Sequence, residues 1–279
     1  MRCALYTPNF GYLGEAATLA EFAAEAEASG WDGFFIWDHL QWPGMEPAVD
    51  PWIALTAMAM RTKRIALGSM VTPLPRRDLA KLARETTSLD RLSGGRLILG
   101  IGLGWSSIPE WSGFGHADDL KTRGAMLDEG LCVLEALWSG RPVNHRGTYY
   151  TAVCEGFAQA AQKPRIPLWL GGAWPSVKPF RRAAKWEGVI PIAKNVMEGG
   201  SLSPSEIADL RRFIRDQWDE DKSYDIAHLG TTANARDTSR VSEYAAVGTT
   251  WWLEARDPWG TSQDQLIERI RNGPPRVSG

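Results

Sequence analysis

A carboxylate, an imidazole and an indole follow one short apolar run within six positions. The segment FFIWDHLQWPG, residues 34–44, places Asp38, His39 and Trp42 after the apolar residues. An imidazole titrates near neutral pH, so His39 could give, take or stabilise a proton. Asp38 could bond a ligand or orient the loop. Alternatively, Asp38 caps the next turn and His39 packs against the rim. Whether this segment is a catalytic strand end or a plain turn depends on the elements that surround it.

Glycines gather at the ends of other apolar runs. The run RLILGIGLG ends in Gly102 and Gly104, and IPLWLGG ends in Gly171 and Gly172. Without a Cβ, backbone can approach a flat ring or a phosphate closely and present its N–H groups. Strand glycines also serve bulges and tight packing, so one such motif is weak. Two clusters at strand ends favour contact with a ligand.

The chain contains 14 tryptophans, and several fall at or near strand ends. Indoles can fill the gaps between a sheet and its helices, which is the role we expect for one of Trp251 and Trp252. They can also wall a slot for a planar heterocycle by stacking on it. We expect Trp42 and Trp105 to form such a slot.

Short apolar runs alternate with amphipathic stretches along the whole chain, which is typical of βα units on a parallel sheet. The expected strands are CALYTP, DGFFIWD, RIALGSMVTP, RLILGIGLG, IPLWLGG, EGVIPIAK, YDIAHLGT and TTWWLE. Helical stretches lie between them, one starting with Asp50 as N-cap and Pro51 at the first position. About eight units in 279 residues predict an α/β fold, a single (β/α)₈ TIM barrel over residues 1–279. A doubly wound sheet would alternate too, but the count and even spacing favour the barrel.

The segment RPVNHRGTYYTAV reads as a small hairpin inserted after the fourth helix, not as a barrel strand. In a TIM barrel the active site lies where the carboxyl ends of the strands converge. The strand ends here carry Asp38 and His39, the segment GSMVTP, the glycine clusters, Lys194 and Glu254. The barrel would therefore bring these residues to one face.

Composition narrows the possible functions. The formal net charge is −2, which gives no electrostatic reason to expect nucleic acid or an anionic membrane as a partner. No apolar stretch approaches the ~18 residues of a membrane span. The three cysteines are widely spaced, which suits a reducing cytoplasm and matches no disulfide framework. The histidines and cysteines show no metal-ligand spacing, so we expect no metal site.

Several segments resemble the luciferase-like oxidoreductases, which include bacterial luciferase, flavin monooxygenases and enzymes dependent on the deazaflavin coenzyme F420. The resemblance rests on GFFIWDHLQW, IALGSMVTPLPRRDLAKLARETTSLDRLSGGRLILGIGLGW, PLWLGG and AAKWEGVIPI, which occur in the family's order. It covers nearly the whole chain, and LDRLSGGRLILGIGLGW is its most specific part. It implies a TIM barrel that holds a (deaza)flavin at its mouth, often in a homodimer.

The resemblance assigns roles to residues of this chain. An Asp-His pair ends strand two in deazaflavin-dependent members, with the histidine near the carbon that exchanges hydride and a tryptophan shaping the site. Asp38, His39 and Trp42 fill these places. A non-proline cis peptide in strand three corresponds to Met70–Val71.

The remaining cofactor residues follow from the same resemblance. Ser69, Met70 and Val71 would contact the deazaflavin, Gly102, Gly104 and Trp105 would border its ring, and Gly171 and Gly172 would cradle its phosphate.

One departure bears on the substrate. Sugar-phosphate dehydrogenases of the family carry a glutamate proton donor directly after the fourth-strand glycines, and this chain has Trp105 there. Because an indole cannot perform that transfer, a glucose 6-phosphate type of reaction is disfavoured. The chemistry would rest on His39 or on the substrate's own acidity, with Glu254 as a speculative replacement acid.

The leading hypothesis is an F420-dependent oxidoreductase that passes hydride to or from a small organic substrate. An FMN-dependent luciferase-like monooxygenase is the alternative within the family. A phosphate-binding lyase or aldolase would use Lys194 for a Schiff base if burial lowered its pKa. A barrel that binds the cofactor without turnover is a further alternative.

Overall fold

The computed structural model describes residues 1–105, 110–217 and 223–277. Within these ranges the strands are β1 (Arg2–Thr7), β2 (Gly33–Ile36), β3 (Ala66–Ser69), β4 (Thr72–Pro73), β5 (Leu99–Gly102), β6 (Val143–Arg146), β7 (Thr151–Cys154), β8 (Leu168–Trp174), β9 (Gly188–Ala193), β10 (Asp225–Gly230) and β11 (Trp251–Ala255). The α-helices are α1 (Ala16–Ala28), α2 (Pro51–Arg61), α3 (Leu79–Ser93), α4 (Leu120–Trp138), α5 (Val177–Ala183), α6 (Pro204–Arg215), α7 (Ser239–Ala246) and α8 (Gln263–Arg271). Short 3₁₀ helices are η1 (Gly11–Leu13), η2 (Leu74–Arg76), η3 (Ser112–Phe114) and η4 (Val196–Glu198).

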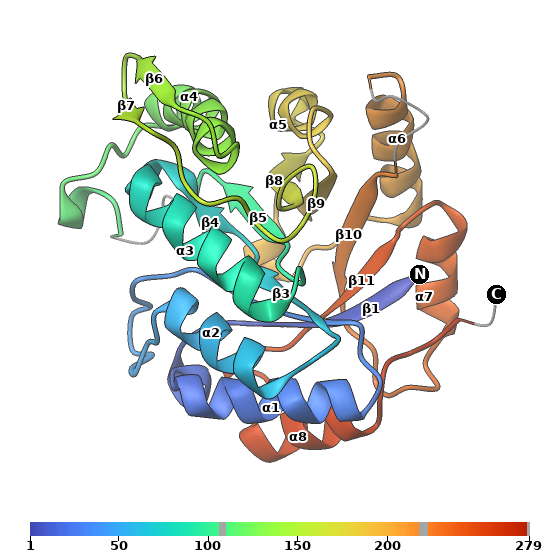
Figure 1. Ribbon diagram of the computed structural model, residues 1–279. Helices are drawn as coiled ribbons and strands as arrows, with labels where there is room; N and C mark the ends of the chain where they lie inside the picture. Colours follow the sequence, from blue (N-terminus) through green and yellow to red (C-terminus); the bar gives the residue numbers. More distant parts are fainter. Residues whose placement is uncertain (106–109, 218–222, 278–279) are drawn as a thin grey trace.

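The described strands form a parallel barrel. The order in the sheet is β3-β2-β1-β11-β10-β9-β8-β5-β4, and β3 and β4 are two parts of one strand interrupted at Met70 and Val71. A parallel bridge between Leu67 and Leu97 joins β3 to the start of β5 and closes the ring. An α-helix follows each of the eight strand positions (Figure 1), which confirms the predicted (β/α)₈ fold.

The interior of the barrel is filled by large side chains. Trp251 meets Phe35 and Trp169 edge to face, Phe35 and Trp169 are tilted to each other, and the ring centroids are 5.4–5.7 Å apart. Trp252 alternates to the outer side and packs against His228 of the neighbouring strand β10 and Tyr244 of α7. Both indoles are therefore buried, one inside the barrel and one between barrel and helices. Because the barrel is a packed core, chemistry is confined to its ends.

The helices begin and end where the sequence predicts. Asp50 accepts hydrogen bonds from the N–H groups of Trp52 and Ile53, with Pro51 as the first residue of α2. Helix α3 is capped by Asp78 and ends at Gly94, whose φ of 72° is left-handed. No helix in the described part of the chain is long and apolar enough to span a bilayer.

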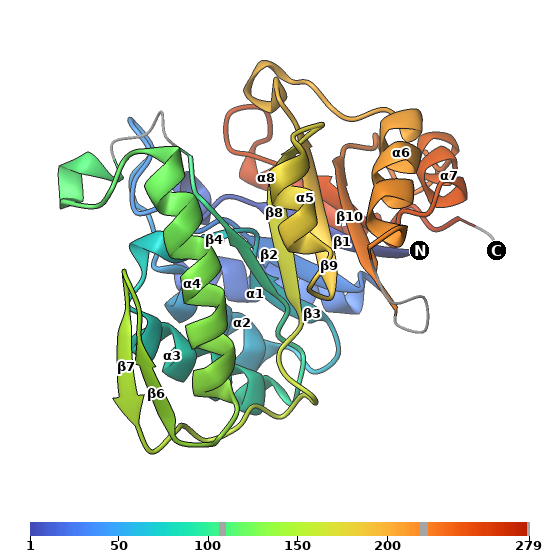
Figure 2. The same ribbon diagram turned by 90° about the horizontal axis from the view of Figure 1, so that it is seen from above.

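Strands β6 and β7 pair antiparallel directly after α4, where the sequence predicts a hairpin. They form a separate two-stranded sheet beside α3 and α4 (Figure 2). Glu129 of α4 holds the hairpin, because its carboxylate accepts the N–H groups of Thr148, Tyr149 and Tyr150 and lies 3.0 Å from Nε2 of His145. The hairpin thus packs outside the barrel.

Candidate active site at the carboxyl ends of the strands

The loop after β2 is held to the loop after β1 by hydrogen bonds between the Asn9 side chain and the backbone of His39. The Asn9 amide donates to the His39 carbonyl over 2.9 Å and its Oδ1 accepts the His39 N–H over 3.3 Å. Asn9 is itself fully buried in the loop after β1. The His39 side chain keeps 16% of its surface exposed. The imidazole is therefore held at the barrel mouth with one edge accessible.

Asp38 is buried in an ion pair with two arginines that follow β4. Its Oδ1 accepts a hydrogen bond from Arg76 over 2.9 Å and also contacts Arg77, and its carbonyl accepts from Arg76 over 2.8 Å. Asp38 is 2% exposed, and its Oδ2 has no hydrogen-bond partner in the part of the chain that the structure describes. The carboxylate therefore orients the loop through one oxygen and has a second, enclosed acceptor left over.

A glutamate that sequence reasoning missed completes this cluster. Glu110, 1% exposed, places Oε2 2.9 Å from Nδ1 of His39 and 2.7 Å from Nη1 of Arg76. Its Oε1 accepts the backbone N–H groups of Leu40 and Gln41. Burial alone would raise the pKa of the Glu110 carboxyl, but His39, Arg76 and a backbone N–H hold its pKa below the usual range. Glu110 is thus an ionised carboxylate that grips the loop bearing His39.

One sequence signal could have identified Glu110. It is the only carboxylate between Gly104 and Asp118, in the loop after the glycine-rich strand. Loops after barrel strands carry the functional side chains, so a lone acidic residue there merits attention.

Trp42 lies in an aromatic cluster on the other side of His39. Its ring stacks on Phe10 with centroids 5.4 Å apart and meets His39 edge to face at 5.3 Å. Trp37 and Trp259 pack against the same ring at 5.9 and 5.2 Å. Half of Trp259 is exposed. The Trp42 ring thus lies directly against His39.

The expected slot between Trp42 and Trp105 is not formed by ring contacts among the described residues. The Trp105 carbonyl accepts a hydrogen bond from the indole of Trp111 over 2.9 Å, and Trp111 is 1% exposed. The partners of the Trp42 ring are instead the aromatic residues of the loops after β1, β2 and β11.

The interruption between β3 and β4 contains the predicted cis peptide at Met70–Val71. The hydroxyls of Ser69 and Thr72 lie 2.6 Å apart across it, and both residues are fully buried. A Cβ on Gly102 would lie 2.6 Å from a Val71 methyl, and one on Gly171 would lie 3.1 Å from another. A side chain at position 102 would therefore displace Val71, and one at position 171 would press on it more mildly.

Gly104 and Gly172 also have packing reasons for lacking a side chain. Gly104 has a φ of 76°, and a Cβ there would collide with Trp111 and lie 2.9 Å from Pro73. A Cβ on Gly172 would lie 2.5 Å from Pro179 of α5. The groups that approach these two glycines closely are thus other residues of the protein. Larger residues at these positions would disturb the fold before they met a ligand.

Two sequence hypotheses are wrong. Glu254 is fully buried outside the barrel interior, where it accepts from Thr232 and Trp252 and pairs with Arg256 and Arg269, so it cannot replace an acid at the mouth. The Lys194 side chain is exposed. The burial that a Schiff-base lysine would need is therefore missing.

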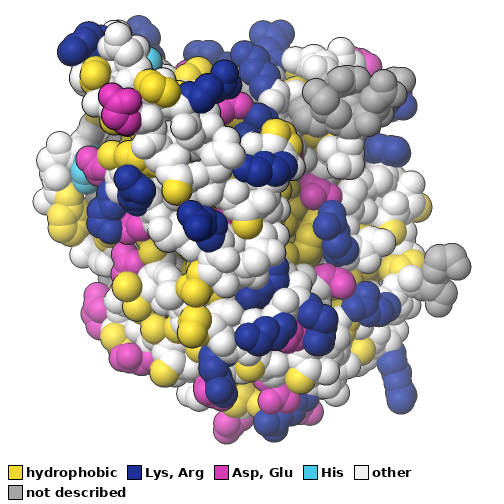
Figure 3. Space-filling view, viewed as in Figure 1, with side chains coloured by type: hydrophobic (Ala, Val, Ile, Leu, Met, Phe, Trp, Pro, Cys, Tyr) yellow, Lys and Arg dark blue, Asp and Glu magenta, His cyan; other side chains and the backbone are white. Residues whose placement is uncertain are grey.

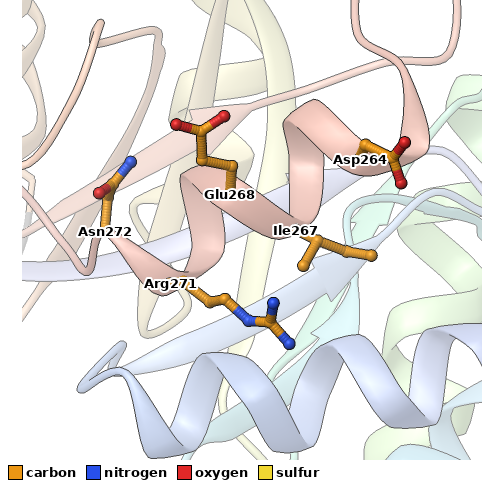
Figure 4. A pocket seen from close by; sticks show the side chains of 5 residues that line it. All are labelled: Asp264, Ile267, Glu268, Arg271 and Asn272. Atoms are coloured by element: carbon orange, nitrogen blue, oxygen red, sulfur yellow. The ribbon is translucent and has the colours of Figure 1, made fainter.

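Two hollows on the surface lie away from the strand ends described above. One of about 390 Å³ is confined to α8 and the residue after it, as Figure 4 shows. Another of about 610 Å³ lies at the amino ends of the strands, where Arg2 pairs with Asp225 and Arg276 with Asp32. Paired charges at this end of a barrel indicate a role in stability. No cluster of potential metal ligands occurs among the described residues.

Comparison with known proteins gives the family. The model of the family described as luciferase-like monooxygenase matches residues 2–269. The chain belongs to this family. The match confirms the family resemblance that segments such as DHLQW and GSMVTP indicate, and it extends over nearly the whole chain.

Family members of known sequence include several named as F420-dependent glucose-6-phosphate dehydrogenases. The one from Amycolatopsis mediterranei is 29% identical over 273 residues, which cover 90% of this chain and 75% of the relative. The one from Nakamurella multipartita is 33% identical over 178 residues, 60% of this chain and 51% of the relative. The chain thus spans about half the length of several of the curated relatives it matches.

Several solved structures share the fold of this chain. An F420-dependent secondary alcohol dehydrogenase in complex with an F420–acetone adduct superimposes with a TM-score of 0.78 at 16% identity, covering 100% of this chain and 99% of that one. A monooxygenase from Streptomyces bottropensis gives a TM-score of 0.77 at 17% identity, covering 98% and 97%. At these identities the likeness is one of fold.

Proposed function

We propose that this family member is an oxidoreductase that binds the deazaflavin F420 at the carboxyl ends of its strands and transfers hydride to or from a small organic substrate. The observation that carries the proposal is His39: its Nδ1 is held by Glu110, while its Nε2 has no partner among the described residues and is not enclosed by protein. An imidazole held in this way can exchange a proton with a substrate. The relatives named as F420-dependent enzymes support the same choice.

Residues of the mouth fit a deazaflavin. The unpaired, buried Oδ2 of Asp38 could accept an N–H of the ring. Val71, with Ser69 and Met70 behind it, would support the ring face, and the backbone near Gly102, Gly104 and Trp105 would border it. The side chain of Ser176, the N-cap of α5, makes no capping bond, so the first amides of α5 beyond Gly171 and Gly172 could meet the phosphate.

The deazaflavin would supply two-electron hydride chemistry, and the protein would supply binding, orientation and the proton. His39 would give or take that proton at Nε2. Trp42 and its aromatic neighbours would shape the substrate side and exclude water from it. Asp38 would serve in both loop orientation and cofactor contact.

FMN is the alternative cofactor, and it would turn the chemistry toward oxygen-dependent monooxygenation. A solved structure of the same fold supports this alternative: a Baeyer–Villiger monooxygenase in complex with FMN, with a TM-score of 0.66 at 18% identity. The lyase hypothesis has no such support, because Lys194 is exposed.

Titration of the purified apo-protein with F420 and with FMN, followed by quenching of tryptophan fluorescence, tests the proposal. A bound ring beside Trp42 should quench strongly. Saturable binding of F420 in preference to FMN is the expected result, and assays with glucose 6-phosphate, secondary alcohols, imines and enones would follow. Preference for FMN would establish the alternative, and binding of neither would refute both.

Helix α2 supports a homodimer. Its outward face carries Ile53 and Met60, which are 62% and 63% exposed, and Leu92 of α3 is 49% exposed. Figure 3 shows hydrophobic side chains over this region of the molecule, at lower left in the view of Figure 1. A helix that is apolar on its outer face as well is usually covered. Sedimentation should give a dimer for the wild type and a monomer for Ile53→Lys with Met60→Lys.

We further propose that residues 1–279 act as one domain in the cytoplasm. Strand β1 pairs with β11, so the two ends of the chain complete the same barrel. All three cysteines are free thiols, which is typical of a reducing compartment. A single unfolding transition, and the retention of all thiols by protein purified under non-reducing conditions, are the expected results.

A further inference from the structure

We propose that Glu110 and Arg76 are positioning residues that fix His39 with its proton on Nδ1 and direct Nε2 to the reacting substrate. This inference rests on the proposed function for the role of Nε2, but the state of the ring can be measured without any cofactor. The pair comes from two loops that the sequence places far from His39. Neither residue would touch the substrate or the cofactor.

The first step concerns the proton on the His39 ring. Glu110 is ionised, because His39, Arg76 and a backbone N–H all hold its pKa low. An ionised carboxylate only accepts hydrogen bonds, so the ring nitrogen 2.9 Å away must carry a proton whether the imidazole is neutral or charged. Nδ1 is therefore protonated in both states, and the proton that comes and goes is the one on Nε2.

The second step concerns what holds Glu110. Arg76 donates to Glu110 over 2.7 Å through Nη1 and to Asp38 over 2.9 Å through Nη2, and the three side chains are at most 2% exposed. A planar guanidinium that bridges two carboxylates fixes both in one geometry. With Arg77, the cluster has two positive and two negative groups, so it is balanced without His39. The carboxylate thus stays in place through a catalytic cycle in which His39 changes charge.

The third step concerns the loops. Glu110 lies in the loop after β5, and Arg76 lies in η2 after β4. Leu40 and Gln41, whose backbone N–H groups donate to Glu110, lie in the loop after β2. One cluster therefore joins three consecutive strand ends at the mouth. On the opposite side the ring of His39 packs against Trp37 and Trp42. These contacts leave Nε2 as the accessible nitrogen, on the side where substrate would bind.

Two-bond ¹H–¹⁵N correlation spectra of the apo-protein test the proposal directly, because they distinguish the two neutral tautomers of each imidazole. The chain has four histidines, and the signals of His39 are those missing from His39→Asn. Above the pH range in which these signals titrate, we expect the wild type to show the Nδ1–H form. In Glu110→Gln the amide can offer either an oxygen or an N–H to the ring, so the Nε2–H form should become populated.

Glu129→Gln is the matched control. It removes the carboxylate that lies beside His145 in the hairpin and should leave the His39 signals unchanged. A wild type in the Nε2–H form would overturn the proposal without any variant. An Nδ1–H form that persists in Glu110→Gln would also overturn it, since another group would then set the tautomer.

Kinetics provide the second readout. Glu110→Gln should lower kcat by about tenfold or more and change the affinity for F420 by less than about threefold, because the tautomer matters at the reacting atoms and not in cofactor binding. A loss of F420 affinity with unchanged kcat would contradict a positioning role. If the wild type binds no F420 or FMN, the proposed function fails, while the tautomer spectrum still decides the geometry around His39.

Discussion

Among the described residues, two histidine–glutamate pairs have nearly equal lengths, and they differ in what surrounds them. At the mouth, Glu110 lies 2.9 Å from Nδ1 of His39; at the hairpin, Glu129 lies 3.0 Å from Nε2 of His145. Both carboxylates also accept backbone N–H groups of the segment that carries the histidine. The exposed fractions of the two glutamate side chains are 1% and 16%.

The difference lies in the arginine and in the sequence separation. Arg76 binds Glu110 and connects it to a second buried carboxylate, whereas no arginine bonds to Glu129 in the described structure. His39 and Glu110 are 71 residues apart, and His145 and Glu129 only 16. The hairpin pair thus closes a local turn, while the mouth pair joins two strand ends and leaves Nε2 accessible. A histidine–glutamate pair can thus hold a local turn together, or it can position an imidazole for acid–base chemistry.

Replacing the two histidines should separate these roles most strongly. His39→Asn should lower turnover by about 100-fold or more, because general acid–base catalysis contributes at least this much. His145→Asn should leave turnover within about twofold. Steady-state kinetics measure both, with F420 affinity from fluorescence as the control. An equal fall in turnover and in affinity for His39→Asn would indicate a binding role instead.

Removing an arginine should affect stability next. Arg76→Met leaves Asp38 and Glu110 buried without their shared partner and should lower the free energy of unfolding by about 3–5 kcal/mol. Arg182→Met breaks an ion pair with Asp128, which is 62% exposed, and should cost no more than about 1 kcal/mol. Urea unfolding of the two variants gives the comparison. Similar losses would show that the buried cluster is not a special element of stability.

Acid should weaken the two pairs to different extents. The pKa values of Glu110 and Glu129 are both lowered on folding, by the histidine and the backbone N–H groups in each case and by Arg76 at Glu110 alone, against the opposing effect of desolvation. A carboxyl with a lowered pKa stabilises the fold above its unfolded pKa of about 4.3, and this contribution is lost as the pH falls further.

The decrease in unfolding free energy from pH 7 to pH 3 should therefore be smaller in Glu110→Gln and in Glu129→Gln than in the wild type. The change at Glu110 should be the larger and should persist in 0.5 M salt, because buried charges are screened less. If both variants changed the pH dependence of the unfolding free energy equally, and both changes disappeared in 0.5 M salt, Glu110 would be far more hydrated than its burial indicates.

The smallest effect is expected at Lys194. The side chain is exposed at the end of β9, so Lys194→Ala should leave turnover within about twofold. Treatment with borohydride in the presence of a carbonyl substrate should trap no adduct on the protein, as mass spectrometry would show. A trapped adduct at this position would return the lyase hypothesis to consideration.

The sequence by itself determined the barrel and the position of its chemistry. Each strand and helix is encoded locally, by apolar runs and by caps such as Asp50 and Gly94. Parallel strands must then bring their carboxyl ends together, so Asp38 and His39 were placed at the mouth without knowledge of any contact. The cis peptide at Met70–Val71 followed from the family resemblance of the segment around it.

Only the tertiary structure decided what each strand-end residue contacts. Glu110 meets His39 across 71 residues, through a loop that has no periodic pattern from which a contact could be read. Glu254 follows an apolar run much as Asp38 does, yet it lies within β11, where side chains alternate, and it points outward to Arg256 and Arg269. Gly102 and Gly104, which suggested room for a ligand, instead make room for Val71 and Trp111 of the same chain. Local pattern fixes the order of elements, whereas partners depend on distances between segments that only folding sets.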